Sequence, residues 1–283
     1  MDDGRPIGVF DSGIGGLSVL QRIREHLPYE NLVYVADARY LPYGDKPPEL
    51  IETRALCICQ FLTAQKAKAV VVACNTATAA AIARMRERFS LPIIGMEPGI
   101  KPALAMTRSG VVGVLATRET LSSRKFESLV TRFGGDKKLV VQACPGLVEV
   151  VEQLALNSAG TRALVARYVG LLLDQGADTL VLGCTHYPWL SDLIQEIAGP
   201  GIVIIDTGEA VAREVSRRLK AADVLTLQTS SGMEQFYTTG ELAGFEQVVA
   251  RLWSRSAPVM ALPAGFGDGH TDIIDFSPNR NCR

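Results

Sequence analysis

The stretch VVVACNTAT, residues 70–78, decides the fold, because the chain carries a near-copy of it, LVLGCTHYP, at residues 180–188. In both stretches an apolar run typical of a buried strand ends at a small residue and a cysteine, and a helix-like pattern follows. Cys74 and Cys184 therefore occupy equivalent positions in two halves of the chain. The register extends further, since Cys74 follows Asp11 by 63 positions and Cys184 follows Thr117 by 67. This spacing predicts the duplication of one α/β unit.

Strand-like and helix-like patterns alternate on both sides of the two cysteine turns. Because parallel strands need long crossover connections, this alternation predicts parallel sheets covered by helices. We therefore predict an α/β protein with two pseudo-symmetric domains, each a mostly parallel sheet flanked by helices. The expected strands of the first unit are residues 7–10, 32–36, 69–73 and 91–95. In the second unit VVGVLATRETLSSRKFESL is expected to supply a strand, a polar turn and a helix, and further strands are expected at residues 139–143, 179–182 and 202–205.

The order of these patterns also predicts where the domains begin and end. We expect a first domain at residues 1–97 plus 209–255, a second at residues 98–208, and a C-terminal extension at residues 256–283. The return to the first domain is expected to supply a strand at residues 224–228 and a helix at residues 245–252. The segment APVMALPAGFGDGHTD is typical of loop or extended tail. We therefore expect that removing residues 257–283 leaves turnover intact.

Composition excludes several classes of function. Lys plus Arg number 29 against 30 for Asp plus Glu, so charge gives no reason to expect a nucleic-acid partner. The N-terminus MDDGRPIG lacks the pattern of a secretory signal, and no apolar run approaches the roughly 20 residues that span a bilayer. Six cysteines without regular spacing predict reduced thiols and no metal site. We predict a cytoplasmic protein that does not bind membranes.

Polar residues gather in the turns that follow the predicted strands. Ligands of open parallel sheets bind at the carboxyl ends of the strands, where these turns meet. If the two units face each other, their cysteines come from opposite walls of one cleft. The residues expected in these turns are Asp11, Ser12, Cys74, Asn75, Thr117, Cys184, Thr185 and His186.

The two cysteines suggest proton transfer. A lone cysteine at a strand end is usually a small buried hydrophobe, but two at repeated positions favour a function. A thiol just before a helix is expected to become a thiolate more readily, and Thr76 is a candidate cap for that helix. Two facing thiols can remove a proton from one side of a carbon and deliver another to the opposite side. This chemistry requires no cofactor.

Three further side chains are candidates for assisting roles. Asp11 leads the Gly-rich turn DSGIGG, whose spacing does not match a phosphate loop, so this carboxylate is expected to aid proton transfer, bind an ammonium or cap the turn. His186 lies two positions after Cys184, where a structural histidine is the alternative. Glu152 falls on the polar side of a predicted helix, so its pattern alone favours a solvated position.

The motifs GVFDSGIGGLSVL, PYGDK, VVACNTATA, GVLAT, LVLGCTHYP and IIDTGEAVA, in this order, resemble those of the glutamate racemases of the aspartate/glutamate racemase superfamily. The resemblance covers about residues 7–215. It implies cofactor-independent interconversion of L- and D-glutamate, supplying D-glutamate for peptidoglycan, at a site between two α/β domains. Aspartate racemase and a non-catalytic binding protein of the same fold are the alternatives.

The resemblance also implies roles for individual residues. Cys74 is similar to the base that acts on D-glutamate and Cys184 to the base that acts on L-glutamate, with Asp11, His186 and Glu152 as assisting residues. Family members are often dimers, some are activated by a peptidoglycan precursor, and some bind DNA gyrase. The residues matching substrate-binding positions are Asp11, Ser12, Tyr43, Gly44, Asn75, Thr76, Thr117, Thr185 and His186.

Overall fold

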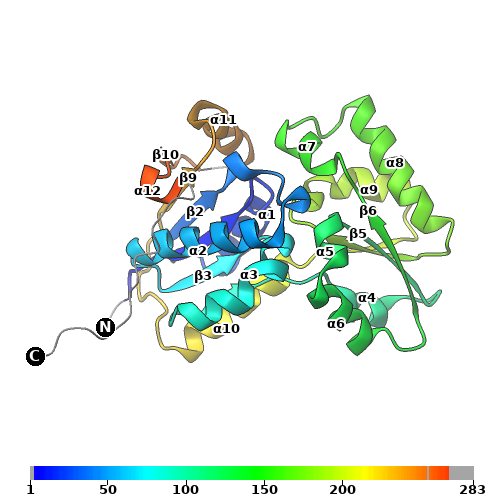
Figure 1. Ribbon diagram of the computed structural model, residues 1–283, viewed down its shortest axis with the longest axis horizontal. Coiled ribbons are helices and arrows are strands. Elements are labelled where there is room, and N and C mark those ends of the chain that lie inside the picture. Colours follow the sequence, from blue (N-terminus) through cyan, green and yellow to red (C-terminus); the bar gives the residue numbers. More distant parts are fainter. Residues whose placement is uncertain (1–2, 254, 268–283) are drawn as a thin grey trace, which may run out of the picture.

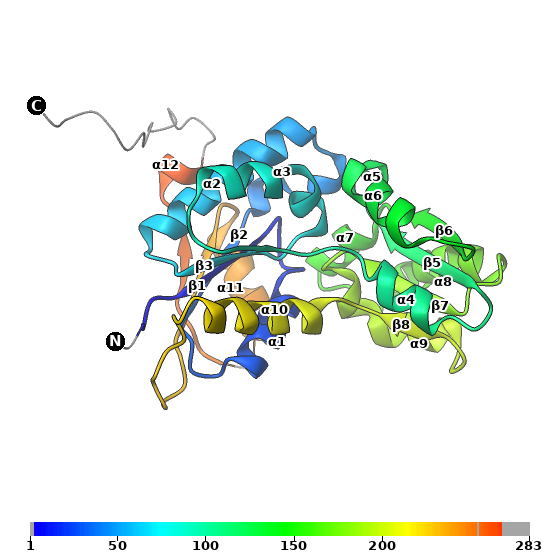
Figure 2. The same cartoon turned by 90° about the horizontal axis from the view of Figure 1, so that it is seen from below.

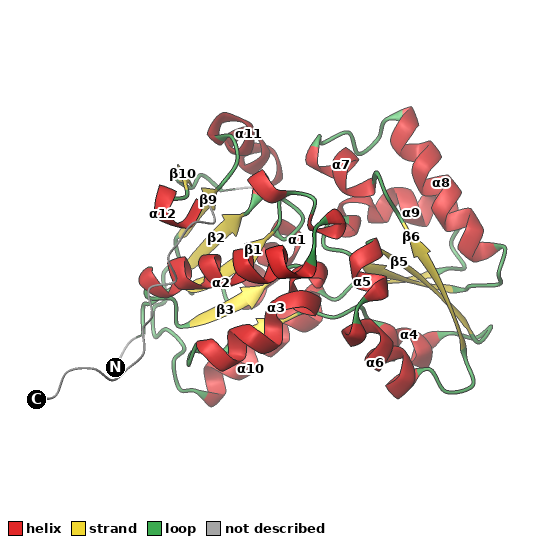
Figure 3. Ribbon diagram, in the orientation of Figure 1, coloured by secondary structure: helices red, strands yellow, loops and turns green. Residues whose placement is uncertain are grey.

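Two α/β domains lie side by side in the computed structural model, which describes residues 3–253 and 255–267 (Figure 1). Each domain contains one sheet, and helices cover both faces of each sheet (Figure 3). All strand pairs among the described residues are parallel. The predicted fold class is confirmed.

The sheet of the first domain has six strands in the order β10-β9-β2-β1-β3-β4. Both faces of its central strands are covered, so these strands are almost continuously apolar, as expected for a buried parallel sheet. The strands are β1 (Ile7–Asp11), β2 (Leu32–Ala36), β3 (Ala69–Val72), β4 (Ile93–Gly95), β9 (Glu234–Thr238) and β10 (Val259–Ala261).

Alternate residues of these strands pack against different helices. Val9 and Tyr34 face a core shared with α1 (Leu17–His26), α10 (Gly208–Ala221) and α11 (Leu242–Leu252). Phe10 and Val35 point to the other face, which is covered by three other helices. These helices are α2 (Pro48–Ala64), α3 (Asn75–Arg88) and the short α12 (Ala264–Gly267).

The second domain repeats this plan on a smaller scale, with a four-stranded sheet in the order β6-β5-β7-β8. Its strands are β5 (Val111–Ala116), β6 (Lys138–Ala143), β7 (Thr179–Gly183) and β8 (Val203–Ile205). One face packs on α4 (Ile100–Met106), α5 (Arg118–Ser122) and α6 (Arg124–Phe133). The other is covered by α7 (Leu147–Glu152), α8 (Ala159–Leu173) and α9 (Ser191–Ala198).

The chain passes between the domains twice, after β4 into α4 and after β8 into α10, as Figure 2 shows. The hydrophobic core on the α1 side of the first sheet continues into the α8 and α9 side of the second. The two domains therefore share part of their core. None of the helices in the described part of the chain is long and apolar enough to cross a membrane.

Two predictions about the C-terminal part are wrong. Residues 224–228 are not a strand; instead Glu234–Thr238 pairs with β2, while Val224 and Leu225 pack on the core from an irregular segment. Residues 259–261, predicted as loop or tail, form the edge strand β10 on β9, and α12 follows. Pro258 and Pro263 flank this three-residue strand, and prolines are tolerated there because β10 lies at the sheet edge.

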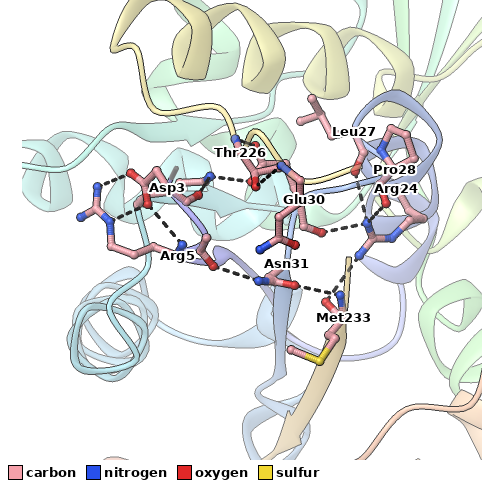
Figure 4. A network of polar contacts seen from close by, with 12 residues as sticks. Asp3, Arg5, Arg24, Leu27, Pro28, Glu30, Asn31, Thr226 and Met233 are labelled. Carbon is pink, nitrogen blue, oxygen red and sulfur yellow. Dashed lines mark hydrogen bonds and ion pairs between the residues drawn. The ribbon is translucent and has the colours of Figure 1, made fainter. Parts of the chain in front are cut away.

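A network of charged side chains lies at the other end of the first sheet, away from the carboxyl ends of its strands (Figure 4). Lys68 and Glu30 form an ion pair of 2.5 Å with side chains 0% and 2% exposed. The second oxygen of Glu30 accepts from the backbone NH of Thr226 at 2.8 Å, and Lys68 also donates to the carbonyl of Asp3. The network therefore joins the N-terminal segment to the link between α10 and β9.

Candidate active site

Equivalent strands position the two cysteines. Cys74 follows β3, which pairs with β1, and Asp11 is the last residue of β1. Cys184 follows β7, which pairs with β5, and Thr117 directly follows β5. Each cysteine therefore follows a strand whose neighbour in the sheet leads to the equivalent polar residue, Asp11 in the first domain and Thr117 in the second.

Both cysteines line a narrow cavity to which the two domains contribute. Cys74 is 4% exposed and Cys184 is 7% exposed. The free space is about 10 Å³, room for the centre of about one water molecule. An amino acid therefore enters only if the walls move apart. The lining residues are Ser12, Pro42, Tyr43, Gly44, Cys74, Asn75, Thr76, Thr117, Val148, Cys184, Thr185 and His186.

Cys74 is itself the N-cap of α3. Its sulfur accepts a hydrogen bond from the backbone NH of Ala77 at 3.4 Å, so the predicted capping role of Thr76 is wrong. Burial raises the pKa of Cys74 well above its usual value, and the charge of Asp11 raises it further. These effects outweigh the hydrogen bond from the helix NH, so the expectation that the helix favours a thiolate is wrong for this closed cavity.

Cys184 lies at one end of a chain of polar contacts. Its sulfur is 3.6 Å from Nδ1 of His186, and Nε2 of His186 is 2.6 Å from Oε1 of Glu152. Burial lowers the pKa of His186, but the contacts with Cys184 and Glu152 outweigh burial and raise it well above its usual value. His186 is therefore held as an imidazolium that can stabilise negative charge on the sulfur.

Glu152 joins the two domains. Its Oε1 also accepts a hydrogen bond from the backbone NH of Ile14 at 2.8 Å, so a residue of α7 is bound to the Gly-rich turn after β1. Its helix pattern favoured a solvated position, and this interpretation is wrong, because the Glu152 side chain is only 16% exposed. A side chain at Gly13 would collide with Glu152, and one at Gly15 with His186. The glycines of DSGIGG therefore allow Glu152 and His186, which we call the dyad, to lie close to the backbone of this turn.

Asp11 lies behind the cavity wall and is fully buried. Its Oδ1 accepts from the NH of Ser12 at 2.7 Å, and its Oδ2 accepts from the NH of Gly16 at 2.6 Å. The hydroxyl of Thr185 donates to the same Oδ2 from the second domain at 3.2 Å. These donors hold a carboxylate beside Cys74 in one orientation.

Hydroxyl and amide groups occupy the rest of the cavity wall. The hydroxyls of Thr76 and Thr117 lie 3.0 Å apart across the domain boundary, and Thr120 contacts both. Asn75 is 4% exposed, and neither polar atom of its carboxamide has a hydrogen-bond partner among the described residues. A buried amide without partners costs free energy. A polar ligand in the cavity could satisfy it.

The loop at Tyr43 and Gly44 closes the cavity from the side of β2. The Tyr43 hydroxyl donates to Oδ2 of Asp37 at 2.5 Å, and Gly44 lies against Thr117 of the second domain, where a Cβ would be 2.9 Å from that of Thr117. Asp37 and the lining residues Pro42 and Val148 were not among the residues predicted for the site. Asp37 directly follows β2, so the strand-end rule that selected Asp11 could also have selected it.

Ten of the predicted residues therefore line the cavity, and Asp11 and Glu152 lie directly behind its wall. The arrangement offers two thiols from opposite domains, a carboxylate beside one and an imidazolium beside the other. Groups in such different surroundings are typical of acid and base partners. Among the described residues, no group of three or more His, Cys, Asp and Glu side chains is placed to hold a metal ion.

Comparison with known proteins supplies independent evidence. The model of the Asp/Glu/Hydantoin racemase family matches residues 7–215. A glutamate racemase of Methylococcus capsulatus is 57% identical over 266 residues, which covers 93% of this chain and 97% of that relative.

Solved structures agree with the sequence comparison. A glutamate racemase isoform of Bacillus anthracis superimposes with a TM-score of 0.85 at 34% identity, covering 93% of this chain and 98% of that one. The Escherichia coli glutamate racemase, solved with L-glutamate and the activator UDP-MurNAc-Ala, gives a TM-score of 0.81 at 30% identity, covering 91% and 98%.

Proposed function

The chain belongs to the Asp/Glu/Hydantoin racemase family, and we propose that it interconverts L- and D-glutamate by proton transfer between two thiols. The resemblance noted in the motifs is thereby confirmed. The observation that carries the proposal is that Cys74 and Cys184 reach one cavity from equivalent strand ends of two domains. Names of relatives that match over nearly their whole length support glutamate as the substrate.

In the direction from D- to L-glutamate, the thiolate of Cys74 takes the proton from Cα. The electron pair of the broken C–H bond moves into the α-carboxylate, and the thiol of Cys184 gives its proton to the opposite face of Cα. Cys74 then carries the proton and Cys184 the charge, so the reverse reaction starts from this state. The polar wall formed by Asn75, Thr76 and Thr117 is suited to bind the carboxylates and stabilise the charge that develops.

The surroundings of the thiols suggest how each is prepared. Because burial and the charge of Asp11 raise the pKa of Cys74, this residue is a thiol in the closed cavity, and we assign Asp11 to receive its proton when substrate binds. This transfer moves the negative charge from Asp11 to the sulfur of Cys74, where the ammonium of the substrate would stabilise it. On the other side, the imidazolium of His186, held by Glu152, stabilises the thiolate of Cys184.

Circular dichroism of D-glutamate solutions tests the proposal with four proteins. We expect the wild type to racemise glutamate, and Cys74→Ala and Cys184→Ala each to lose about 10³-fold in kcat, within the range for general acid–base groups. Cys144→Ala is the matched control. This thiol is as buried as those of Cys74 and Cys184, but it donates a hydrogen bond to the backbone carbonyl of Gln142. Full activity in either active-site variant would contradict the two-thiol mechanism, and activity on aspartate alone would contradict the substrate.

Biological context and assembly are part of the same proposal. We assign the protein to the cytoplasm, where thiols stay reduced as the two-thiol mechanism requires, and to the supply of D-glutamate for peptidoglycan. The resemblance also suggests a homodimer, which sedimentation equilibrium would detect. Activity measured with and without UDP-MurNAc-Ala tests whether the chain shares the activator named for the Escherichia coli relative.

A further inference from the structure

A fully buried ion pair lies behind the active-site loop. Arg54 of α2 and Asp37 after β2 are both 0% exposed, and the guanidinium donates to both carboxylate oxygens at 3.0 Å. Two more groups donate to Asp37: the hydroxyl of Tyr43 at 2.5 Å and the hydroxyl of Thr239 at 2.9 Å. The carboxylate is thus fixed by four hydrogen bonds. One of them comes from a residue that lines the active-site cavity.

The C-terminal part of the chain completes this arrangement. Arg54 donates a further hydrogen bond to the carbonyl of Phe266 in α12 at 3.0 Å. The ring of Phe266 packs on Phe61 of α2, with ring centroids 5.5 Å apart. Ahead of α12, β10 extends the sheet beside β9, and the NH of Leu262 donates to the carbonyl of Thr238 at 2.7 Å. Residues 259–267 are therefore attached to the same sheet and helix that carry the ion pair.

From these contacts we propose that residues 259–267 position the substrate loop, through Arg54 and Asp37, by fixing the hydroxyl of Tyr43. The inference rests on the proposed function, because its readout is the binding of glutamate. The expectation that removing residues 257–283 leaves turnover intact is kept for kcat, but residues 259–267 are now expected to affect the binding of glutamate. Arg54, Asp37 and Phe266 are positioning residues in this account, since none of them lines the cavity.

Orientation explains the buried pair better than stability does. A buried ion pair contributes little net stability compared with apolar residues of similar volume, because both charges lose their hydration. A bidentate Arg–carboxylate pair does, however, fix geometry. The hydroxyl of Tyr43 is held at one end and the carbonyl of Phe266 at the other. A change at Phe266 can therefore reach the cavity wall without any contact with the substrate.

A double-mutant cycle on the full chain tests the proposal, with KM and kcat for D-glutamate as readouts. We expect Phe266→Ala to raise KM about fivefold, the factor that corresponds to the free energy of one net hydrogen bond. The kcat of this variant is expected to stay within about twofold of the wild-type value. Tyr43→Phe removes the last link and is expected to raise KM by a similar factor. Because both changes break one chain of contacts, the double variant should be no worse than the poorer single variant.

Phe89→Ala is the matched control, because Phe89 is also partly buried against the same hydrophobic cluster but lies at the end of α3. Its KM is expected to stay at the wild-type value. Multiplicative effects in the double variant, an unchanged KM in Phe266→Ala, or an equal rise in Phe89→Ala would each overturn the proposal. If Phe266→Ala does not fold, Arg54→Lys replaces it in the cycle with the same expectations. A wild type without glutamate turnover would refute the proposed function itself, whereas an active wild type with multiplicative effects refutes only this inference.

Discussion

Replacing Glu152 by glutamine removes one negative charge and almost no volume from the polar chain behind Cys184. In the wild type, Oε1 of Glu152 accepts from His186 at 2.6 Å and from the NH of Ile14 at 2.8 Å. Glutamine keeps one oxygen acceptor at this place, so the contact with Ile14 can survive. The charge that helps to keep His186 protonated is lost.

The magnitude follows from the type of hydrogen bond that is lost. A hydrogen bond to a charged group contributes about 1.5–3 kcal/mol and a neutral one about 1 kcal/mol. The Glu152 side chain is 16% exposed, so water screens part of its charge, and we take a difference of about 1.4 kcal/mol. This corresponds to about a tenfold loss in kcat/KM. Because two enantiomers have an equilibrium constant of one, the loss is the same in both directions.

The pH dependence of the variant follows from the pKa of His186. The contact with Glu152 raises this pKa and burial lowers it, so removing the charge lets the pKa fall. The variant then loses its imidazolium at a lower pH than the wild type does. We expect the tenfold gap in kcat/KM near pH 8 to narrow toward pH 6. The difference in the free energy of unfolding between wild type and variant shows the opposite trend and is largest at low pH. A raised histidine pKa stabilises the fold fully below about pH 6.5, and this stabilisation is lost as pH rises through the folded pKa.

Initial rates by circular dichroism between pH 6 and pH 9 would measure this effect. Glu149→Gln is the control, since it removes a carboxylate from the same helix, one turn before Glu152. The control is expected to keep the wild-type pH profile. If Glu152→Gln also kept that profile, or if its deficit grew toward acidic pH, the assigned role of the dyad would be wrong.

Two further substitutions separate binding from stability. Asn75→Ala should raise the KM for glutamate about tenfold. It should also stabilise the ligand-free protein by about 1 kcal/mol, because it removes a buried amide without partners among the described residues. Urea unfolding measures this, and a variant less stable than the wild type would contradict the prediction. Lys68→Met should lower the free energy of unfolding by about 3–5 kcal/mol, because it leaves Glu30 buried without its counter-ion, and kcat of the folded fraction should not change. A large fall in kcat would show that the network in Figure 4 is coupled to the active site.

The repeated cysteine turn allowed much of the fold and site to be predicted. Strand-end positions in a parallel sheet depend on local pattern and chain direction alone, so Asp11, Cys74, Thr117 and Cys184 could be placed at the carboxyl ends of strands from the sequence pattern. The alternation of strand and helix likewise predicted both sheets. Local pattern was sufficient wherever a feature depended on nearby residues.

Features that depend on distant residues could not be predicted in this way. Glu152 has a polar-face pattern, and its contacts with Ile14, 138 positions away, and with His186, 34 positions away, distinguish it from a solvated carboxylate. The importance of Asp37 depends on Arg54 and Thr239, which come from other elements. Strand β10 has three residues and becomes a strand only because β9 offers a free edge. The cap at Cys74 was missed because a sulfur took the place usually held by a hydroxyl.

Racemisation in D₂O tests the central claim most directly, namely that two thiols act on opposite faces of one carbon. The deuterium content of each enantiomer is measured by mass spectrometry during the first few per cent of conversion of D-glutamate. We predict that every molecule of L-glutamate formed carries one deuterium at Cα, delivered by Cys184, while the remaining D-glutamate keeps its protium. Transfer of the original proton into L-glutamate would show that a single group serves both faces and would contradict the account.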